Sequence, residues 1–295
     1  MFEANEYEIE TPCLFENRHC IIYTATKNSK KYIAKFYPAI YQRQENETKI
    51  HNKLKEDKNY SKYIVPLVEV FSFRDYNVYI YDRGEYDMFD FMYENEEDFH
   101  TLLEICIRVI DCIDFIHSYG IIHLDIKPEN VVIFHENGKK IPKLIDFEYA
   151  QFLEGKEFIQ HKTLMGTKGS LDLLLIEWMD YYGHVFYSKS NDVYSIAVLI
   201  YEIFYGDRFI PPKKYKRGDL LISRKKNIDK LIRDVLDKIL IYDSASKRLN
   251  LTELKNKLLI IQKDKDDKKD NEDDKDNKIL KKEAVTGLKT KAESI

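Results

Sequence analysis

Short apolar runs separated by polar turns dominate the first third of the chain. Two such runs, at residues 20–25 and 32–36, flank a polar turn at residues 27–30, and this alternation predicts a β-hairpin. Residues 41–56 are mostly polar, but Ile50 and Leu54 recur at helical spacing, which predicts a helix with one buried face. Two more strand-like runs follow at residues 65–73 and 77–82.

The pattern becomes helical from residue 99 onward. Apolar side chains recur at helical spacing over residues 99–119, and residues 191–205 are apolar on most sides, which predicts a central buried helix. Residues 229–241 and 251–261 predict two further amphipathic helices. Strands followed by helices indicate an α+β protein with a β-rich lobe and a helical lobe. The charged stretch 263–278 has almost no apolar residues, so we expect disorder there.

Composition narrows the class of protein without identifying a function. The 295 residues are 44% hydrophobic and 33% charged, which is typical of a soluble globular protein with a large core. A net charge of −4 offers no basic field for nucleic acid, and the longest apolar stretch, at residues 193–205, is too short for a membrane span. The acidic N-terminus predicts no secretory signal, and four cysteines without a CxxC pair indicate reduced thiols. We therefore expect a cytoplasmic or nuclear protein.

One short region concentrates the residues that could carry chemistry. Residues 123–130 read HLDIKPEN, an apolar run follows, and residues 143–147 read KLIDF. This order places a carboxylate at Asp125, a cation at Lys127, an amide at Asn130 and a second carboxylate at Asp146. Phosphoryl transfer from ATP needs such a set, because one carboxylate orients the attacking hydroxyl, hard oxygen ligands hold magnesium and a lysine offsets charge.

The region resembles the catalytic loop of the eukaryotic-type protein kinase superfamily, followed by the metal-binding carboxylate of that family. Lys127, two positions after Asp125, is typical of its serine/threonine kinases. The resemblance implies an N-terminal extension at 1–7, a bilobal kinase domain at 8–262 with lobes at about 8–82 and 87–262, and a disordered tail at 263–295. It also implies ATP and Mg²⁺ as cofactors, with Asn130 and Asp146 as metal ligands, and a protein substrate with a Ser or Thr acceptor. It says nothing of oligomeric state.

Further positions follow from the same resemblance. Lys35 ends the run YIAK, which is similar to the family strand whose lysine binds the α and β phosphates. Its expected partner on the following helix is Glu47, with Glu45 as the alternative. Ile80 would be the gatekeeper. The resemblance implies three further sets of nucleotide contacts. Ile22, Ile33 and Val132 would form the adenine pocket, and Tyr81 to Arg83 would form the hinge. Asp87 and Glu129 would contact the ribose.

The helical part of the chain carries three more family-like features. The Thr167 hydroxyl of the pair Gly166-Thr167 should contact Asp125 and Lys127, and Asp192 should anchor the backbone of residues 123–124. Arg248 resembles an arginine that pairs with a glutamate in the family tripeptide Ala-Pro-Glu. That tripeptide is absent here, so we expect Glu177 to be the partner.

Three departures from the family pattern bear on activity. Residues 15–20, the expected phosphate loop, contain no glycine, so either Arg18 or His19 replaces backbone contacts to phosphate or the loop stands further out. Leu124 replaces an arginine that reads a phosphorylated residue, so phosphorylation of Thr163 is not expected to be an obligatory switch. Glu148 replaces a flexible glycine, which disfavours a flip of Asp146.

Two other classes of protein remain open. A pseudokinase, acting as a nucleotide-binding or scaffold module, would explain the glycine-free loop and the substitution at position 148. A small-molecule phosphotransferase would share the spacing of His123, Asp125 and Asn130. The Lys-Pro-Glu-Asn run, the Gly166-Thr167 pair and the Asp192 motif argue against the second class.

Overall fold

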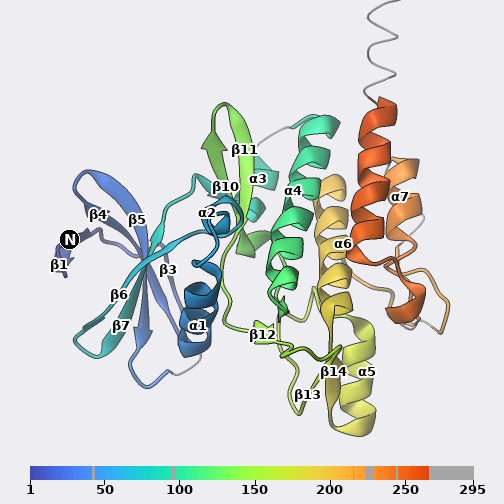
Figure 1. The fold of residues 1–295 in the computed structure, drawn as a ribbon, viewed down its shortest axis with the longest axis horizontal. Coiled ribbons are helices and arrows are strands. Elements are labelled where there is room, and N and C mark those ends of the chain that lie inside the picture. Colours follow the sequence, from blue (N-terminus) through green and yellow to red (C-terminus); the bar gives the residue numbers. More distant parts are fainter. Residues whose placement is uncertain (42–43, 95–96, 215, 223–228, 244, 266–295) are drawn as a thin grey trace, which may run out of the picture.

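The computed structural model describes residues 1–41, 44–94, 97–214, 216–222, 229–243 and 245–265. A β-rich lobe is followed along the chain by a helical lobe (Figure 1). In the first lobe, strands run in the antiparallel order β1-β2-β4-β5-β7-β6, and β3 pairs with β4. Its elements are β1 (Phe2–Ala4), β2 (Tyr7–Ile9), β3 (Phe15–Glu16), β4 (Ile21–Lys27), β5 (Lys30–Pro38), α1 (Gln44–Leu54), α2 (Tyr60–Tyr63), β6 (Leu67–Phe73) and β7 (Tyr76–Asp82).

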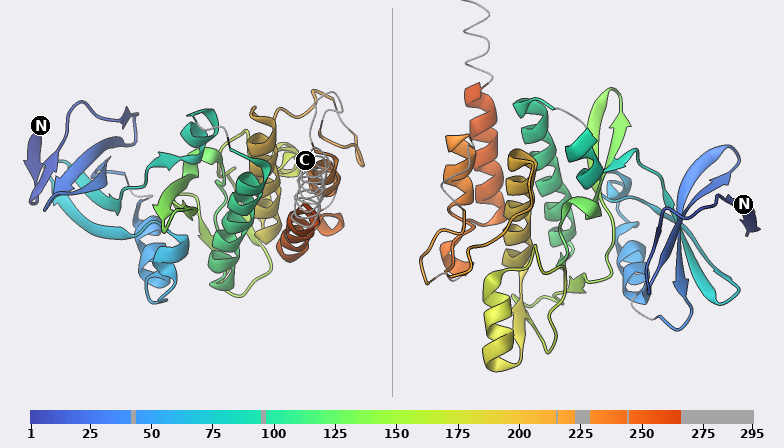
Figure 2. Two further views of the ribbon diagram at one scale, coloured as in Figure 1. Left: turned by 90° about the horizontal axis from the view of Figure 1, so that it is seen from above. Right: turned by 180° about the vertical axis from the view of Figure 1, so that it is seen from behind.

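The two faces of this sheet bury different side chains. Ala34 and Phe36 of β5 pack with Ile80 in one apolar cluster. Ile33 belongs to another cluster, together with Tyr81 of the neighbouring strand. Because successive strand residues point to opposite faces, Lys35 lies on the same face as Ile33. On that face Tyr81 donates a hydrogen bond to Glu47 of helix α1, and Val132 and Ile145 of the second lobe join the same cluster. Figure 2 shows the sheet, helix α1 and the second lobe from two further sides.

The second lobe is built around helices α4 and α6, which share one large apolar core. The side chain of Asp98 caps the start of α4, and Gly206 ends α6 in a left-handed conformation. A helix over residues 251–265 packs on the same core. The named elements are β8 (Tyr86–Asp87), α3 (Met88–Glu94), α4 (Phe99–Ser118), β9 (Ile121–Ile122), η1 (Pro128–Asn130), β10 (Val131–Glu136), β11 (Lys139–Leu144), β12 (Gln151–Phe152), β13 (Ile159–His161), α5 (Leu173–Tyr182), β14 (Val185–Tyr187), α6 (Lys189–Tyr205), α7 (Lys230–Leu236) and η2 (Ala245–Lys247).

The structure corrects the domain boundaries at both ends. Residues 1–7, expected as an extension, instead contribute β1 and the start of β2, and Ala4 and Tyr7 are buried in the core of the first lobe. At the other end, residues 263–265 continue the last helix, where Lys265 forms an ion pair with Asp229 at 2.8 Å. The rest of the expected tail lies outside the described residues. None of the helices in the described ranges has the length and hydrophobicity needed to cross a membrane.

Candidate active site

A buried carboxylate holds the start of the catalytic loop. The backbone amides of His123 and Leu124 donate hydrogen bonds to Asp192 of α6, at 2.8 and 2.9 Å. The ring of His117 lies 2.8 Å from the same carboxylate. Burial alone would raise the pKa of Asp192, but the hydrogen bonds from His117 and the His123 amide leave this pKa below its usual value. Asp192 therefore anchors residues 123–124, as predicted.

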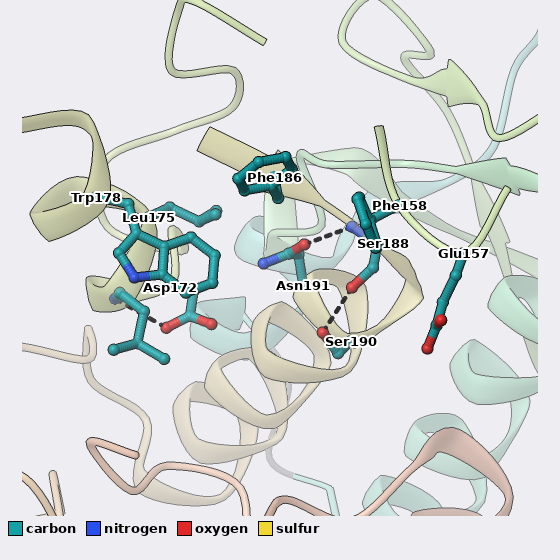
Figure 3. Close-up of a pocket in the computed structure, with 10 residues that line it drawn as sticks. Glu157, Phe158, Asp172, Leu175, Trp178, Phe186, Ser188, Ser190 and Asn191 are labelled. Atoms are coloured by element: carbon teal, nitrogen blue, oxygen red, sulfur yellow. Dashed lines mark hydrogen bonds between the residues drawn. The ribbon is translucent and has the colours of Figure 1, made fainter. Parts of the chain in front are cut away.

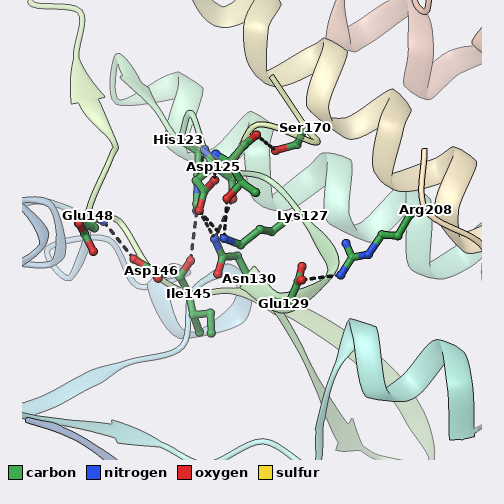
Figure 4. Close-up of polar contacts among 11 residues, drawn as sticks. His123, Asp125, Lys127, Glu129, Asn130, Ile145, Asp146, Glu148, Ser170 and Arg208 are labelled. Atoms are coloured by element: carbon green, nitrogen blue, oxygen red, sulfur yellow. Dashed lines mark hydrogen bonds and ion pairs between the residues drawn. The ribbon is translucent and has the colours of Figure 1, made fainter. Parts of the chain in front are cut away.

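Asp125 lies at the centre of a polar cluster between the lobes (Figure 4). This residue is only 2% exposed. One oxygen is 2.9 Å from the Lys127 ammonium and accepts a hydrogen bond from the Asn130 amide at 2.9 Å. The other accepts from the Thr167 backbone amide at 2.7 Å. The Thr167 hydroxyl accepts from Lys127 at 2.8 Å. Sequence reasoning assigned both contacts to this hydroxyl, whereas the structure divides them between hydroxyl and backbone.

Gly166 is required by a close backbone approach. Its φ is +98°, a conformation that side-chain-bearing residues rarely adopt. A Cβ atom at this position would lie 2.1 Å from the carbonyl oxygen of Leu124. The glycine therefore lets the next residue, Thr167, reach Asp125.

Asp146 follows β11 in a left-handed conformation, with φ at 65°. The next residue, Phe147, is fully buried against the rings of His51 and His123, at centroid distances of 5.3 and 5.1 Å. Burial raises the pKa of Asp146 more than the nearby Lys35 charge lowers it.

Asn130 and Asp146 together fit a magnesium site. They supply an amide and a carboxylate oxygen close to Asp125 (Figure 4). Mg²⁺ usually takes one or two carboxylates and completes its shell with water and phosphate oxygens. Within the described ranges, no group of three or more acidic, histidine or cysteine side chains could hold a metal alone. The donor set therefore suits a metal that arrives with a nucleotide.

Lys35 and Glu47 are both buried, and they are close enough for their charges to interact. Glu47 of α1 is fully buried whereas Glu45 is exposed, so the structure selects Glu47. Burial would raise the pKa of Glu47, but the Lys35 charge, His51 and the Tyr81 hydroxyl lower it overall. Tyr81 donates its hydrogen bond to Glu47 at 2.8 Å, and no ion pair joins Lys35 to Glu47 among the described residues. The lysine and glutamate thus interact through charge rather than direct contact.

The three side chains predicted to enclose adenine lie together, and their contact with a nucleotide stays a prediction. Ile22, Ile33 and Val132 lie in a single apolar cluster that also contains Tyr81. Ile80, the expected gatekeeper, is buried on the opposite face of the sheet. Tyr81 takes that position instead, which moves the hinge forward by one residue.

Gly84 is a hinge residue that sequence reasoning missed. A Cβ atom there would lie 2.2 Å from a side-chain carbon of Val132, so the hinge passes directly over the pocket floor. A glycine two residues after a strand was the available signal. Arg83 is a predicted hinge contact. Its side chain donates a hydrogen bond to the Thr24 hydroxyl at 3.1 Å.

The two predicted ribose contacts have partners within the protein. Asp87 accepts a hydrogen bond from the Asp90 amide at 2.8 Å and so supports the first turn of α3. Glu129 forms an ion pair with Arg208 at 2.5 Å. Their contacts with a ribose stay predictions.

The phosphate loop, residues 15–20, is closed by a side chain. The side-chain oxygen Oδ1 of Asn17 accepts hydrogen bonds from the backbone amides of His19 and Cys20, at 2.8 and 2.9 Å. These amides would otherwise be available to a phosphate group. Arg18 donates to the ring of His19 at 2.7 Å, and Cys20 packs in the cluster that contains Tyr81.

Residues 146–172, here called the activation segment, are held by contacts that do not need a phosphate. Leu124 is buried with Leu153, Met165 and Leu171. An arginine at position 124 could not pack in this apolar cluster without burying its charge.

Contacts from the first lobe hold the beginning of the activation segment. The Tyr41 hydroxyl donates to Glu148, and the ring of Tyr41 lies 5.0 Å from that of His19 in the phosphate loop. Asn46 of α1 donates to the carbonyl of Ala150 at 2.6 Å. Glu148 therefore takes part in a contact between the lobes that glycine could not make.

The predicted partner of Arg248 is wrong. Arg248 forms a buried ion pair with Asp172, which also caps the start of α5 by accepting from the Leu174 amide at 3.1 Å. Glu177 instead accepts a hydrogen bond from the Tyr242 hydroxyl. Asp172 is the N-cap residue of α5 and lies five residues before Glu177, so the start of the helix, and not its middle, meets Arg248.

Two cavities lie near these residues. One, of about 300 Å³, lies between α5, β14 and the start of α6 and is lined by Trp178, Phe186 and Phe158 (Figure 3). It is separate from the catalytic loop. The other, of about 310 Å³, borders Lys127 and Thr167 directly.

Comparison with known proteins agrees with this geometry. The Aurora kinase of Candida glabrata is 31% identical over 156 residues, covering 50% of this chain and 39% of that protein. The mitosis inhibitor protein kinase SWE1 of Candida albicans is 27% identical over 238 residues, covering 74% and 19%. The serine/threonine-protein kinase dkf-1 of Caenorhabditis elegans is 32% identical over 104 residues, covering 35% and 13%. The chain spans less than half the length of each of these relatives.

The family comparison covers most of the chain. Residues 17–260 match the family described as "Protein kinase domain", and this range includes the catalytic loop, Lys35 and the activation segment. The chain therefore belongs to the protein kinase family.

Proposed function

We propose that this protein transfers the γ-phosphoryl group of ATP to Ser or Thr hydroxyls of protein substrates. The observation that carries the proposal is the arrangement around Asp125, whose two oxygens meet Lys127, Asn130 and the Thr167 amide. Lys127 and the name of the relative dkf-1, a serine/threonine-protein kinase, support Ser/Thr specificity. Cysteines without disulfide partners support a cytoplasmic or nuclear location.

In this mechanism each residue has one role. Asp125 orients the substrate hydroxyl and accepts its proton, while Lys127 offsets negative charge on the transferred group. Asn130 and Asp146 would hold magnesium, which offsets charge on the phosphates. Lys35 lies near Asp146 and would bind the α and β phosphates. MgATP supplies the phosphoryl group.

A pseudokinase is the second candidate, and one observation favours it. The two amides at the tip of the phosphate loop are already bonded to Asn17, so the loop offers a nucleotide fewer free donors. The ordered catalytic loop opposes it, because a chain without turnover has no need to keep Asp125, Lys127 and Thr167 in contact.

A peptide library incubated with radiolabelled MgATP tests the proposal. We expect label on Ser- and Thr-containing peptides and none on peptides whose only hydroxyl is Tyr. The Asp146→Ala variant should lose the magnesium-dependent thermal shift with ATP that wild type shows, because it lacks a carboxylate ligand. Binding of MgATP without any labelled peptide would favour the pseudokinase.

A further inference from the structure

The cavity beside the catalytic loop is where the residues next to an acceptor would lie. Lys127 and Thr167 border it, and both contact Asp125. A peptide whose hydroxyl reaches Asp125 must therefore place a neighbouring side chain in or across this space. Glu129, Glu202 and Arg208 form its charged wall.

Arg208 bridges the two glutamates of that wall. Its guanidinium nitrogens lie 2.5 Å from a carboxylate oxygen of Glu129 and 3.3 Å from one of Glu202. Its Cζ atom lies over the Phe89 ring, 4.7 Å from the ring centroid. Figure 4 shows Arg208 reaching from the end of α6 toward Glu129. The guanidinium thus sits where a cation brought by a substrate would meet both carboxylates.

The charges around the cavity are balanced only because of Arg208. The charged residues that line it, within the described chain, are Lys127, Arg208, Glu129 and Glu202, two of each sign. Glu202 is only 5% exposed, and its other oxygen accepts from the Phe209 amide at 3.0 Å. A buried carboxylate without a counter-ion is costly, so removal of Arg208 would leave a strong demand for a cation.

One carboxylate oxygen of the wall is unsatisfied within the described part of the chain. The second carboxylate oxygen of Glu129 is buried and has no hydrogen-bond partner among the described residues. A buried acceptor without a partner favours a ligand that donates a hydrogen bond. An uncharged donor such as a hydroxyl or an amide suffices here, since Arg208 already compensates the charge.

We propose that Arg208 is a specificity-determining residue, which occupies the position of a basic substrate side chain. The cavity then selects peptides with an uncharged, hydrogen-bond-donating side chain near the acceptor. This inference rests on the proposed protein kinase function. It concerns which peptide is bound and leaves the phosphoryl-transfer residues unchanged.

The test uses peptides with one Ser acceptor, in which Arg or Gln is placed at each of the three positions on either side. For each pair, kcat/KM is measured by phosphorylation and Kd by fluorescence polarisation. At every position, wild type should either have a higher kcat/KM for the Gln peptide or show kcat/KM values for the Arg and Gln peptides within about threefold of each other. Arg208→Ala should raise the Arg-to-Gln ratio about tenfold or more at one position at least, because a charged donor then meets two free carboxylates.

Three further variants make the result specific. Arg208→Gln keeps most of the side-chain volume and should shift the ratio as Arg208→Ala does, so a folding defect in one variant leaves the other as a test. Arg208→Lys keeps the charge and should retain the wild-type ratio. Arg217→Ala removes an exposed arginine that pairs with Asp243 instead, and should also leave the ratio unchanged.

Two results would overturn the proposal. One is a wild-type preference for Arg of about tenfold, and the other is an unchanged ratio in both Arg208→Ala and Arg208→Gln. If no peptide is phosphorylated by wild type, the proposed kinase function fails. The Kd ratios then still decide whether Arg208 controls peptide selection.

Discussion

Replacing Gly166 with alanine should damage catalysis far more than folding. The new Cβ atom would lie 2.1 Å from the Leu124 carbonyl oxygen, whereas such contacts are essentially never shorter than 3.0 Å. The two backbones must therefore separate by about 0.9 Å. The Leu124 amide is bonded to Asp192, so most of the movement falls on residues 166 and 167. That movement pulls the Thr167 amide away from Asp125.

The size of the effect follows from this displacement. A misplacement of about 1 Å near the reacting atoms can reduce the rate by about a hundredfold. A side chain at positive φ adds roughly 1–2 kcal/mol of strain, which lowers the melting temperature of a domain of this size by about 2–8 °C. Gly155→Ala isolates the second effect, because Gly155 has φ at +77° and no atom within 4 Å of its ideal Cβ position.

The assay measures kcat for peptide phosphorylation and the melting temperature of both variants. Gly155→Ala should lose stability but keep kcat close to wild type, whereas Gly166→Ala should lose about a hundredfold in kcat. Equal kcat values in the two variants would refute the argument, because the contact with Leu124 would then have no catalytic consequence.

Two other predictions concern the loops that differ from the family pattern. Asn17→Gly should lower the Kd for MgATP about fivefold, as expected if one freed backbone amide binds phosphate with about 1 kcal/mol. Isothermal titration calorimetry measures this Kd, and weaker binding would mean that Asn17 itself contacts the nucleotide. Thr163→Ala should keep most peptide kinase activity with and without phosphatase treatment, because buried Leu124 holds the activation segment. Thr167→Ala should lose activity and Thr167→Ser should restore it, since the hydroxyl accepts from Lys127; a dead Thr163→Ala beside a normal Thr167→Ala would contradict this.

The sequence predicted which side chains of the catalytic loop would lie together, because their spacing is local. Asp125 and Lys127 directly precede Asn130, the last residue of the short helix η1, so their order along the chain already places them together. The choice of Glu47 over Glu45 also followed from the chain, since Ile50 and Leu54 mark the buried face of α1.

Errors arose where one residue of register or a distant partner decided the outcome. Ile80 and Tyr81 are adjacent, and only the pairing with β5 shows that Tyr81 lies on the same face of the sheet as Lys35. Asp172 rather than Glu177 meets Arg248 because tertiary packing, not sequence distance, brings the helix cap to the arginine. The hydrogen bonds of Asn17 likewise depend on the shape of its turn.

The most direct test of the central claim is phosphoryl transfer by Asp125→Asn at saturating MgATP, with the Kd for MgATP measured on the same sample. The account predicts a rate at least about a hundredfold below wild type and a Kd within about twofold, because Asp125 acts on the substrate hydroxyl and not on adenine. A transfer rate within about twofold of wild type would contradict the account, since Asp125 would then not be the base.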